Sequence, residues 1–209
     1  MNKHLEYIAG KKTTEDWKII RQQLIDSGAN AGLWSMVVNE YYQKRLDDRY
    51  LKPIKTLQLY GKLQGEGFSI VTIQCSLIEF LESTIQGKNY RYVRKGETLG
   101  TYEYSSSQKV FVDFLTSRFP FSNEFKPDLA TDFYINVRCG LLHEARTKNG
   151  WRIKAKCPTT IIVNPNDKIV FRDNFQAALI EFIETYKPDL LGRPDYKEAF
   201  IRKFDSLCQ

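Results

Sequence analysis

The sequence is poor in histidine, containing only His4 and His143 in 209 residues. His4 belongs to the first few residues of the chain, where little holds a side chain in a fixed geometry. Any chemistry that needs a positioned imidazole therefore depends on His143. A zinc site with three histidine ligands is excluded by this count, and no HExxH string indicates a metal hydrolase.

Signatures of several common enzyme classes are also missing. The chain has no GxGxxG, P-loop or GxSxG string, which argues against dinucleotide-binding enzymes, P-loop phosphotransferases and serine hydrolases. Its four cysteines are far apart and form no CxxC pair, so we expect reduced thiols. Neither a signal-peptide core nor a run of about 18 apolar residues occurs. We therefore expect a cytoplasmic protein that does not enter the membrane.

The positive charge is modest overall but concentrated in one stretch. The chain has 31 Lys and Arg against 25 Asp and Glu. Positions 138–156 contain one acid, Glu144, and the basic residues Arg138, Arg146, Lys148, Arg152, Lys154 and Lys156. A second cluster, KNYRYVRK at 88–95, interleaves tyrosines with cations such as Arg91 and Arg94. Such clusters suit single-stranded nucleic acid, since cations bind phosphates and rings stack on bases. The alternative is a solvated loop whose tyrosines cover the edge of the core.

Hydrophobic periodicity predicts a mainly α-helical chain. Helical spacing of apolar residues covers 15–27, 33–51, 69–86, 107–118, 128–145, 173–186 and 195–207. Pro53 and Pro188 are expected to end two of these helices. Residues 88–106 are expected to form a loop, and 151–172 a short antiparallel sheet. The prediction is a single helical-bundle domain over 1–209, with its core at about 15–145 and 173–207 and a small β appendage after the motif helix at about 151–172.

The most informative string is FYINVRCGLLHEAR at 133–146, which contains Arg138 and, five positions later, His143. RNA cleavage without a metal needs a group that moves protons, which histidine can supply, and a cation for the phosphate charge, which arginine can supply. On an α-helix the two side chains diverge by about 140°. They converge only if the helix loosens or ends near Gly140, if the arginine wraps back, or if a two-fold dimer joins two copies. In the alternative, His143 stabilises a helix C-terminus and Arg138 pairs with Asp132 or Glu144.

The string VRCGLLHE, preceded by the helix CSLIEFLES, resembles the HEPN domain (higher eukaryotes and prokaryotes nucleotide-binding), whose signature is R-x4-6-H. The likeness covers about residues 69–146. It implies a helical bundle, a homodimer and often a metal-independent endoribonuclease of toxin–antitoxin or antiphage defence, with Arg138 and His143 as the catalytic pair. Many active members have a polar residue where this chain has Cys139. Control by a nucleotidyltransferase is disfavoured, since members silenced that way often have a tyrosine at the position of Ala145.

We therefore expect an endoribonuclease that uses no metal or cofactor, acts on RNA and forms a homodimer. An antitoxin or inhibitor protein is a candidate partner. The alternative is a HEPN-type module that binds nucleotide, RNA or protein without catalysis. Candidate supporting carboxylates are Glu79, Glu82 and Glu144, which could orient the pair. The alternative for Glu79 and Glu82 is that they are exposed to solvent. Candidate RNA-binding residues are Arg146, Lys148, Arg152, Lys154, Lys156, Arg91 and Arg94. Those at 152, 154 and 156 are expected to share one face of a strand, which the alternative explains as a charged face that prevents edge pairing.

Overall fold

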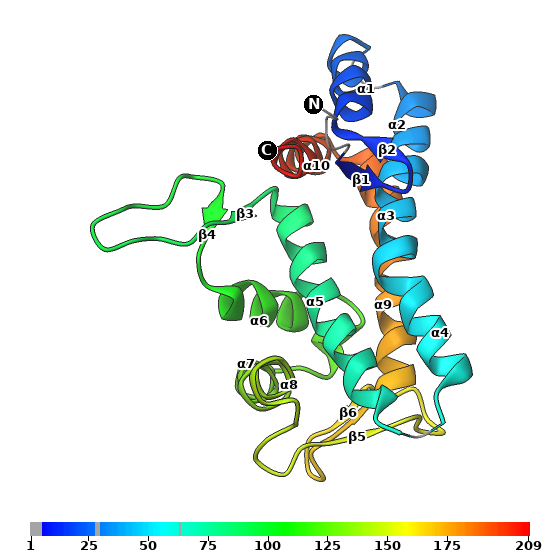
Figure 1. The fold of residues 1–209 in the computed structure, drawn as a ribbon, viewed down its shortest axis with the longest axis vertical. Helices are drawn as coiled ribbons and strands as arrows, with labels where there is room; N and C mark the ends of the chain where they lie inside the picture. The colour runs from blue at the N-terminus through cyan, green and yellow to red at the C-terminus, as the bar shows by residue number, and fades with distance from the viewer. Residues whose placement is uncertain (1–5, 28–29, 63) are drawn as a thin grey trace, which may run out of the picture. The chain divides into compact units, whose positions relative to one another are not determined.

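The structure is a computed structural model that describes residues 6–27, 30–62 and 64–209, so His4 lies outside the described residues. The chain is mainly helical with small sheets of two or three strands, which confirms the predicted fold class (Figure 1). Its residues group into two compact units, whereas the single domain expected from the sequence stays a prediction. Unit 1 comprises Met1–Pro53, Ser83–Ser105 and Lys187–Gln209, and unit 2 comprises Ile54–Glu82 and Ser106–Tyr186.

Unit 1 combines helices from both ends of the chain. It contains α1 (Thr14–Asp26), α2 (Ala31–Val37), the π-helical turn η1 (Val38–Gln43), α3 (Lys44–Leu46), a second π-helical turn η2 (Asp47–Leu51) and α10 (Pro194–Ser206). A hairpin of β1 (Tyr7–Ala9) and β2 (Lys12–Thr13), which the periodicity did not indicate, precedes α1. The rings of Trp17, Phe200 and Phe204 contact one another in the core. Burial of these large rings is what joins α1 to the C-terminal helix.

Two prolines lie inside helices that the sequence predicts to end there, so both predicted ends are wrong. Pro53 is the second residue of α4 (Lys52–Tyr60), which follows η2 directly. Proline has no N–H and its ring crowds the carbonyl four residues earlier, and the wider π-helical turn relieves this crowding. Pro188 lies inside α9 (Arg172–Gly192), where Leu190 is fully buried. A proline inside a helix costs about 3 kcal/mol relative to alanine, and burial of such apolar side chains offsets this cost.

Unit 2 contains the predicted motif helix. Its elements are residues 54–60 of α4, most of α5 (Glu66–Gln86), α6 (Ser107–Ser117), the 3-10 turn η3 (Phe121–Asn123), α7 (Pro127–Phe133), the π-helical turn η4 (Tyr134–Arg138), α8 (Cys139–Glu144) and most of α9. The elements α7, η4 and α8 follow one another without a break, and together they match the helix predicted at 128–145. The ring of Phe133 lies parallel to Phe111 and Phe175, with centroid distances of 6.2 and 5.9 Å. This aromatic packing holds the motif helix against the core of its unit.

The β appendage is a three-stranded sheet of β5 (Arg152–Lys154), β7 (Ile169–Phe171) and β6 (Val163–Asn164), in that spatial order. The strands β6 and β7 form the predicted antiparallel hairpin, but β5 pairs with β7 in parallel. Strands β5 and β6 lie on opposite sides of β7, so residues 155–162 cross from one side of β7 to the other at one end of the sheet. The Asn174 amide holds this crossing by donating to the carbonyl oxygens of Thr159 and Ile161, at 2.6 and 2.8 Å.

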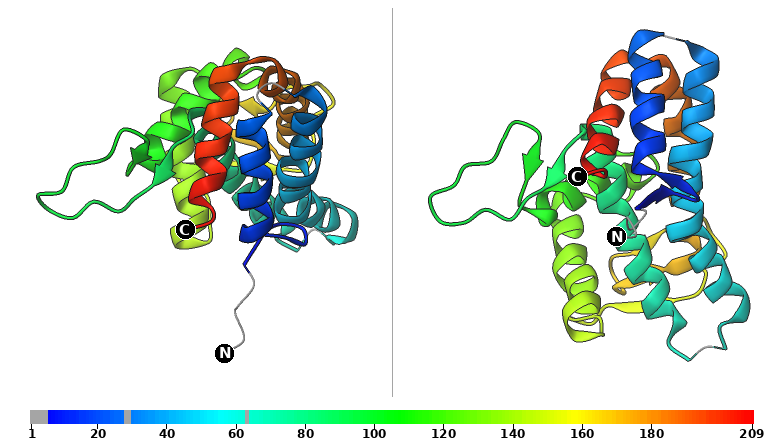
Figure 2. Two further views of the ribbon diagram at one scale, coloured as in Figure 1. Left: turned by 90° about the horizontal axis from the view of Figure 1, so that it is seen from above. Right: turned by 45° about the horizontal axis from the view of Figure 1, so that its top comes forward.

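The loop predicted over 88–106 is an extended arm of unit 1 (Figure 2). Its base is closed by the short parallel strands β3 (Asn89–Tyr90) and β4 (Glu103–Tyr104).

The cysteines of the chain are free thiols. Among the described helices, α5 is long and apolar enough to cross a membrane by length and composition, but 67% of its most apolar window is buried inside the protein. We therefore interpret α5 as a core helix, and the cellular compartment stays a prediction.

Candidate functional site

The motif helix is loosened by a π-helical turn, but earlier than expected. In η4 the backbone N–H of Cys139 donates to the carbonyl of Tyr134, five residues back. Such turns widen a helix and often occur at functional sites. The wide turn ends at Arg138, and the helix is regular through Gly140. Because the loosened turn ends at Arg138 and the residues from Cys139 to His143 are α-helical, the turn does not bring the side chains of Arg138 and His143 into line.

Gly140 allows the chain that follows the motif helix to approach it closely. A Cβ atom at this buried position would lie 2.5 Å from the carbonyl oxygen of Arg146. The chain reverses at Ala145, whose backbone is left-handed with φ of 53°. The N–H of Lys148 then donates to the carbonyl of Asn136 at 2.8 Å. The glycine is therefore a packing requirement, and the helix does not end there, which was one of the three ways for Arg138 and His143 to converge.

Arg138 is anchored by a carboxylate from another helix of unit 2. Its Nη2 atom lies 3.2 Å from Oε2 of Glu79 on α5, and the Oγ of Ser107 donates to the other carboxylate oxygen at 2.7 Å. The guanidinium carbon lies 5.3 Å from the centre of the Tyr134 ring. The Arg138 side chain is only 16% exposed. This arrangement places Glu79 where the sequence predicted a supporting carboxylate, although its role in catalysis stays a prediction.

The surroundings keep the arginine charged and the tyrosine neutral. Burial alone lowers the pKa of Arg138, but the neighbouring Tyr134, Glu79 and Cys139 raise that pKa above its ordinary value. Burial raises the pKa of Tyr134 to about 12. At neutral pH the cluster therefore offers a fixed positive charge and an uncharged phenol, and the guanidinium can bind a phosphate if it shares its charge with Glu79.

His143 lies at the opposite end of α8, in its last turn, and its side chain is exposed. Among the described residues, none is joined to this imidazole by a hydrogen bond or an ion pair, and no contact links it to Arg138. The structure of one chain thus places the two motif residues on the same helical segment without bringing them together. Nearby on this segment, Ile135 and Leu142 are 44% and 46% exposed.

The other two candidate carboxylates have different partners. The side chain of Glu82 is 2% exposed and accepts two hydrogen bonds from the Arg118 guanidinium, at 2.9 and 2.8 Å. The structure therefore pairs Glu82 with Arg118, away from the predicted supporting role. Glu144 accepts from Arg146 and from Lys148, at 2.9 and 3.1 Å. These two hydrogen bonds lower the pKa of Glu144. Both cations were predicted to bind RNA, and an exposed carboxylate already shares their charge.

The basic strand has two of the three predicted residues on its exposed face. Arg152 and Lys154 are exposed on β5, with the half-buried Ile153 between them. Lys156 is also exposed but lies beyond the end of β5, so the strand does not carry all three. Lys156 instead lines a cavity of 770 Å³ in unit 2, together with Phe119 and other residues.

In the arm of unit 1, Arg91 is ion-paired to Glu97 and Glu103. These ion pairs make Arg91 a structural residue of the arm.

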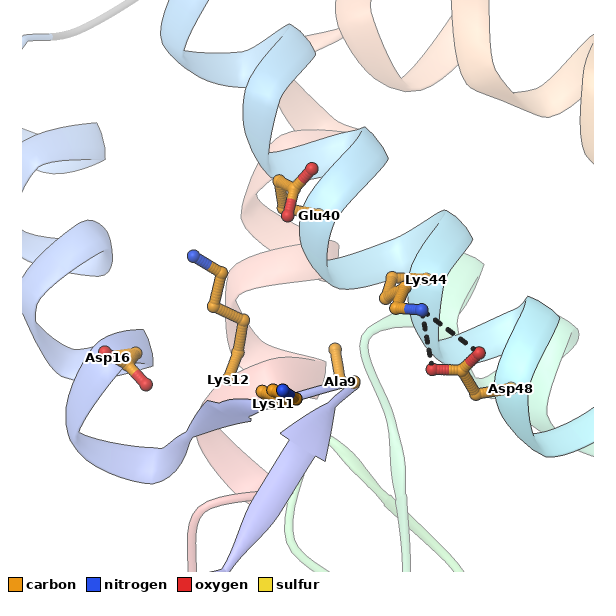
Figure 3. Close-up of a pocket in the computed structure, with 8 residues that line it drawn as sticks. Ala9, Lys11, Lys12, Asp16, Glu40, Lys44 and Asp48 are labelled. Carbon is orange, nitrogen blue, oxygen red and sulfur yellow. Dashed lines mark hydrogen bonds and ion pairs between the residues drawn. The ribbon is translucent and has the colours of Figure 1, made fainter.

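A cavity of unit 1 contains no residue that the sequence singled out (Figure 3). It has a volume of 690 Å³ and lies between the β1–β2 hairpin, α1 and the helical segment η1–α3–η2. Its charged lining residues are Lys11, Lys12, Lys44, Asp16, Glu40 and Asp48. Figure 3 shows Lys44 bonded to Asp48, while Lys12 extends into the opening. Cations and carboxylates balance, so the cavity has no net preference for an anion. Its residues are scattered along the sequence, and only the fold gathers them.

No group of three or more His, Cys, Asp or Glu side chains could hold a metal ion within the part of the chain that the structure describes. Comparison with known proteins gives no relative: no family model, curated protein or solved structure matches this chain.

Proposed function

We propose that the chain is a metal-independent endoribonuclease of HEPN type, in which Arg138 stabilises the charge on the scissile phosphate and His143 transfers protons. The observation that carries this proposal is the contact between Arg138 and Glu79. It holds the motif arginine in one orientation on the same helical segment as an exposed imidazole. A pre-oriented cation is what phosphate stabilisation requires, because no reorganisation is then needed during the reaction.

The proposed reaction follows from these two groups. A base removes the proton of the 2′-hydroxyl, and the 2′-oxygen then bonds to phosphorus. The bond between phosphorus and the 5′-oxygen breaks, and this oxygen takes up a proton. The products are a 2′,3′-cyclic phosphate end and a 5′-hydroxyl end. His143 supplies proton transfer and Arg138 binds the phosphate oxygens.

A two-fold dimer is part of the proposal, because one chain does not bring the pair together. Ile135 and Leu142 are large apolar side chains of the motif segment, and both are exposed. An apolar contact between two copies through these side chains would place two imidazoles and two guanidinium groups in one site. A role in toxin–antitoxin or antiphage defence, with an antitoxin or inhibitor protein as partner in the cytoplasm, belongs to the same proposal.

Incubation of the purified protein with total RNA in excess chelator tests the function. We expect fragments with 2′,3′-cyclic phosphate ends, and losses of at least about a hundredfold in rate for His143→Ala and for Arg138→Ala. Arg21→Ala is the matched control, since Arg21 also forms a half-buried ion pair, with Asp205 in unit 1. Full activity of a folded His143→Ala protein would contradict the proposal. Rescue of a chelated sample by magnesium would indicate a different chemistry.

A binding protein without catalysis is the second candidate function. The observation that favours it is the low exposure of Arg138, whose charge is shared with Glu79. A guanidinium in this position can hold a phosphate without any proton transfer. The same RNA experiment separates the two functions, because a binding protein retards the RNA in a gel and yields no fragments.

A further inference from the structure

The arm of unit 1, residues 88–104, has a scaffold of its own. Arg91 binds Glu103 through Nε at 2.7 Å and Glu97 through Nη1 at 2.9 Å, and it also donates to the carbonyl of Thr98. The N–H of Arg91 donates to the carbonyl of Tyr104 at 2.9 Å, which closes the base of the arm. One arginine therefore joins three points of the arm, and the conformation of its tip is set by these bonds.

The base of the arm is attached to α10 within the same unit. The guanidinium carbon of Arg202 lies 4.1 Å from the centre of the Tyr102 ring. The ammonium group of Lys203 donates to the carbonyl of Lys88 at 3.1 Å. A stacked cation and a charge-assisted hydrogen bond thus hold the two ends of the arm to one helix. Residues 94–102 of the arm are exposed, and both views in Figure 2 show the arm extending away from this helix.

The tip of the arm exposes a ring beside cations. Tyr92 is 73% exposed and Tyr90 is 55% exposed, so these rings do not cover the edge of the core. Arg94 and Lys95 follow Tyr92 after one intervening residue, Val93, and are exposed, and no ion pair joins either side chain to a described residue. The two glutamates of the arm are bound to Arg91 instead. The charge at the tip is therefore positive, and an aromatic ring lies within two residues of it.

We infer that this tip binds single-stranded RNA, with Tyr92 stacking on an unpaired base and with Arg94 and Lys95 contacting phosphates. Rings stack on bases of any sequence because every base has a π face, and adjacent cations follow the backbone. A duplex offers no free base face to such a ring, so single strands are preferred. The inference goes beyond the proposed function, since it concerns a different unit and requires no catalysis.

The test is a fluorescence anisotropy titration of the full chain with a short, fluorescein-labelled oligouridylate. The His143→Ala background keeps the RNA intact if the chain cleaves it. Tyr92→Ala should weaken binding by about fivefold or more, as expected for the loss of one stacked base. Tyr92→Trp should retain the affinity, because the larger ring still stacks. Tyr60→Ala is the matched control and should bind like the parent, since Tyr60 is 77% exposed but lies on α4.

The charges are tested by the dependence of affinity on salt. Replacing Arg94 and Lys95 by glutamine should reduce the slope of log affinity against log salt by about 1.4, which is two phosphate contacts on a single strand at about 0.7 each. Equal affinity of the parent and Tyr92→Ala, with unchanged circular dichroism, would overturn the inference. If Tyr92→Ala changes the oligomeric mass but leaves the RNA affinity unchanged, the inference is also overturned, and the tip contacts protein and not RNA. Because binding is measured without cleavage, failure of this inference and failure of the nuclease proposal are distinguishable.

Discussion

Glu79 of α5 holds Arg138 of the motif segment through a contact of 3.2 Å, although the two residues are 59 positions apart in the sequence. Both side chains are less than a fifth exposed, at 19% and 16%. Solvent screens such a pair less than it screens an exposed one, so the contact restricts the orientation of the guanidinium. If Arg138 binds phosphate, then Glu79 is a positioning residue.

Replacing this carboxylate should affect turnover more than folding. In Glu79→Gln the charge is lost while the shape is kept, which removes a charge-assisted hydrogen bond of about 1.5 kcal/mol or more. We expect the single-turnover cleavage rate to fall about tenfold with little change in KM. Glu79→Asp should recover part of the rate. An unchanged rate in Glu79→Gln would show that the contact is structural only.

Glu82 should behave in the opposite way. Its carboxylate is 2% exposed and bound twice by Arg118, so Glu82→Ala leaves the partner arginine without this ion pair. Breaking such a pair lowers the free energy of unfolding by about 3 kcal/mol. Urea unfolding measures this loss. Glu144→Ala is the control, because its ion pairs are exposed and should contribute less than about 1 kcal/mol. Equal effects of the two substitutions would contradict the assignment.

The exposed apolar side chains of the motif segment, Ile135 and Leu142, should mediate dimerisation. Light scattering of the parent should give about twice 24.4 kDa. A charge at the centre of an apolar interface is strongly unfavourable, so Leu142→Glu should give the monomer mass and lose cleavage. Leu59→Glu is the control, since Leu59 is 65% exposed on α4 and should leave the mass unchanged. A monomeric parent with full cleavage would argue against a shared site.

Gly140 should tolerate no side chain. A Cβ atom there would meet the backbone oxygen of Arg146 at 2.5 Å, and backbone cannot move as easily as a flexible side chain. Gly140→Ala should therefore lower the free energy of unfolding by about 1–3 kcal/mol. Gly192 in α9 has nothing within 4 Å of the same atom, and Gly192→Ala should be neutral or stabilising by up to about 1 kcal/mol. Thermal or urea unfolding of both variants decides the comparison.

Cys75 should be the least reactive thiol of the native protein. It is fully buried, and this burial raises its pKa to about 12. Since the thiolate is the reactive form, alkylation at mildly alkaline pH should spare Cys75 until the protein unfolds. Mass spectrometry after iodoacetamide treatment measures the modified positions. Rapid modification of Cys75 in the folded protein would show that unit 2 opens readily around α5.

Local patterns in the sequence determined most of the helices and the position of the motif. The apolar periodicity over 128–145 places Arg138 and His143 on one helical segment, because a repeat of about 3.6 residues is a property of neighbouring residues alone. The β-branched run at 159–163 predicted a strand of the antiparallel hairpin, but only its last residue, Val163, lies in β6. Charge counting located Tyr92 and its neighbours, although their exposure required the structure.

Only the tertiary structure decided which charges meet. Glu79 and Glu82 are three positions apart on one helix, yet one binds Arg138 and the other Arg118, because each partner comes from a segment remote in sequence. The helical path through Pro53, the parallel pairing of β5 and the enclosure of Arg91 by two glutamates have the same origin. Each depends on which distant residues become neighbours after folding, and long-range packing outweighs local preference where the two disagree.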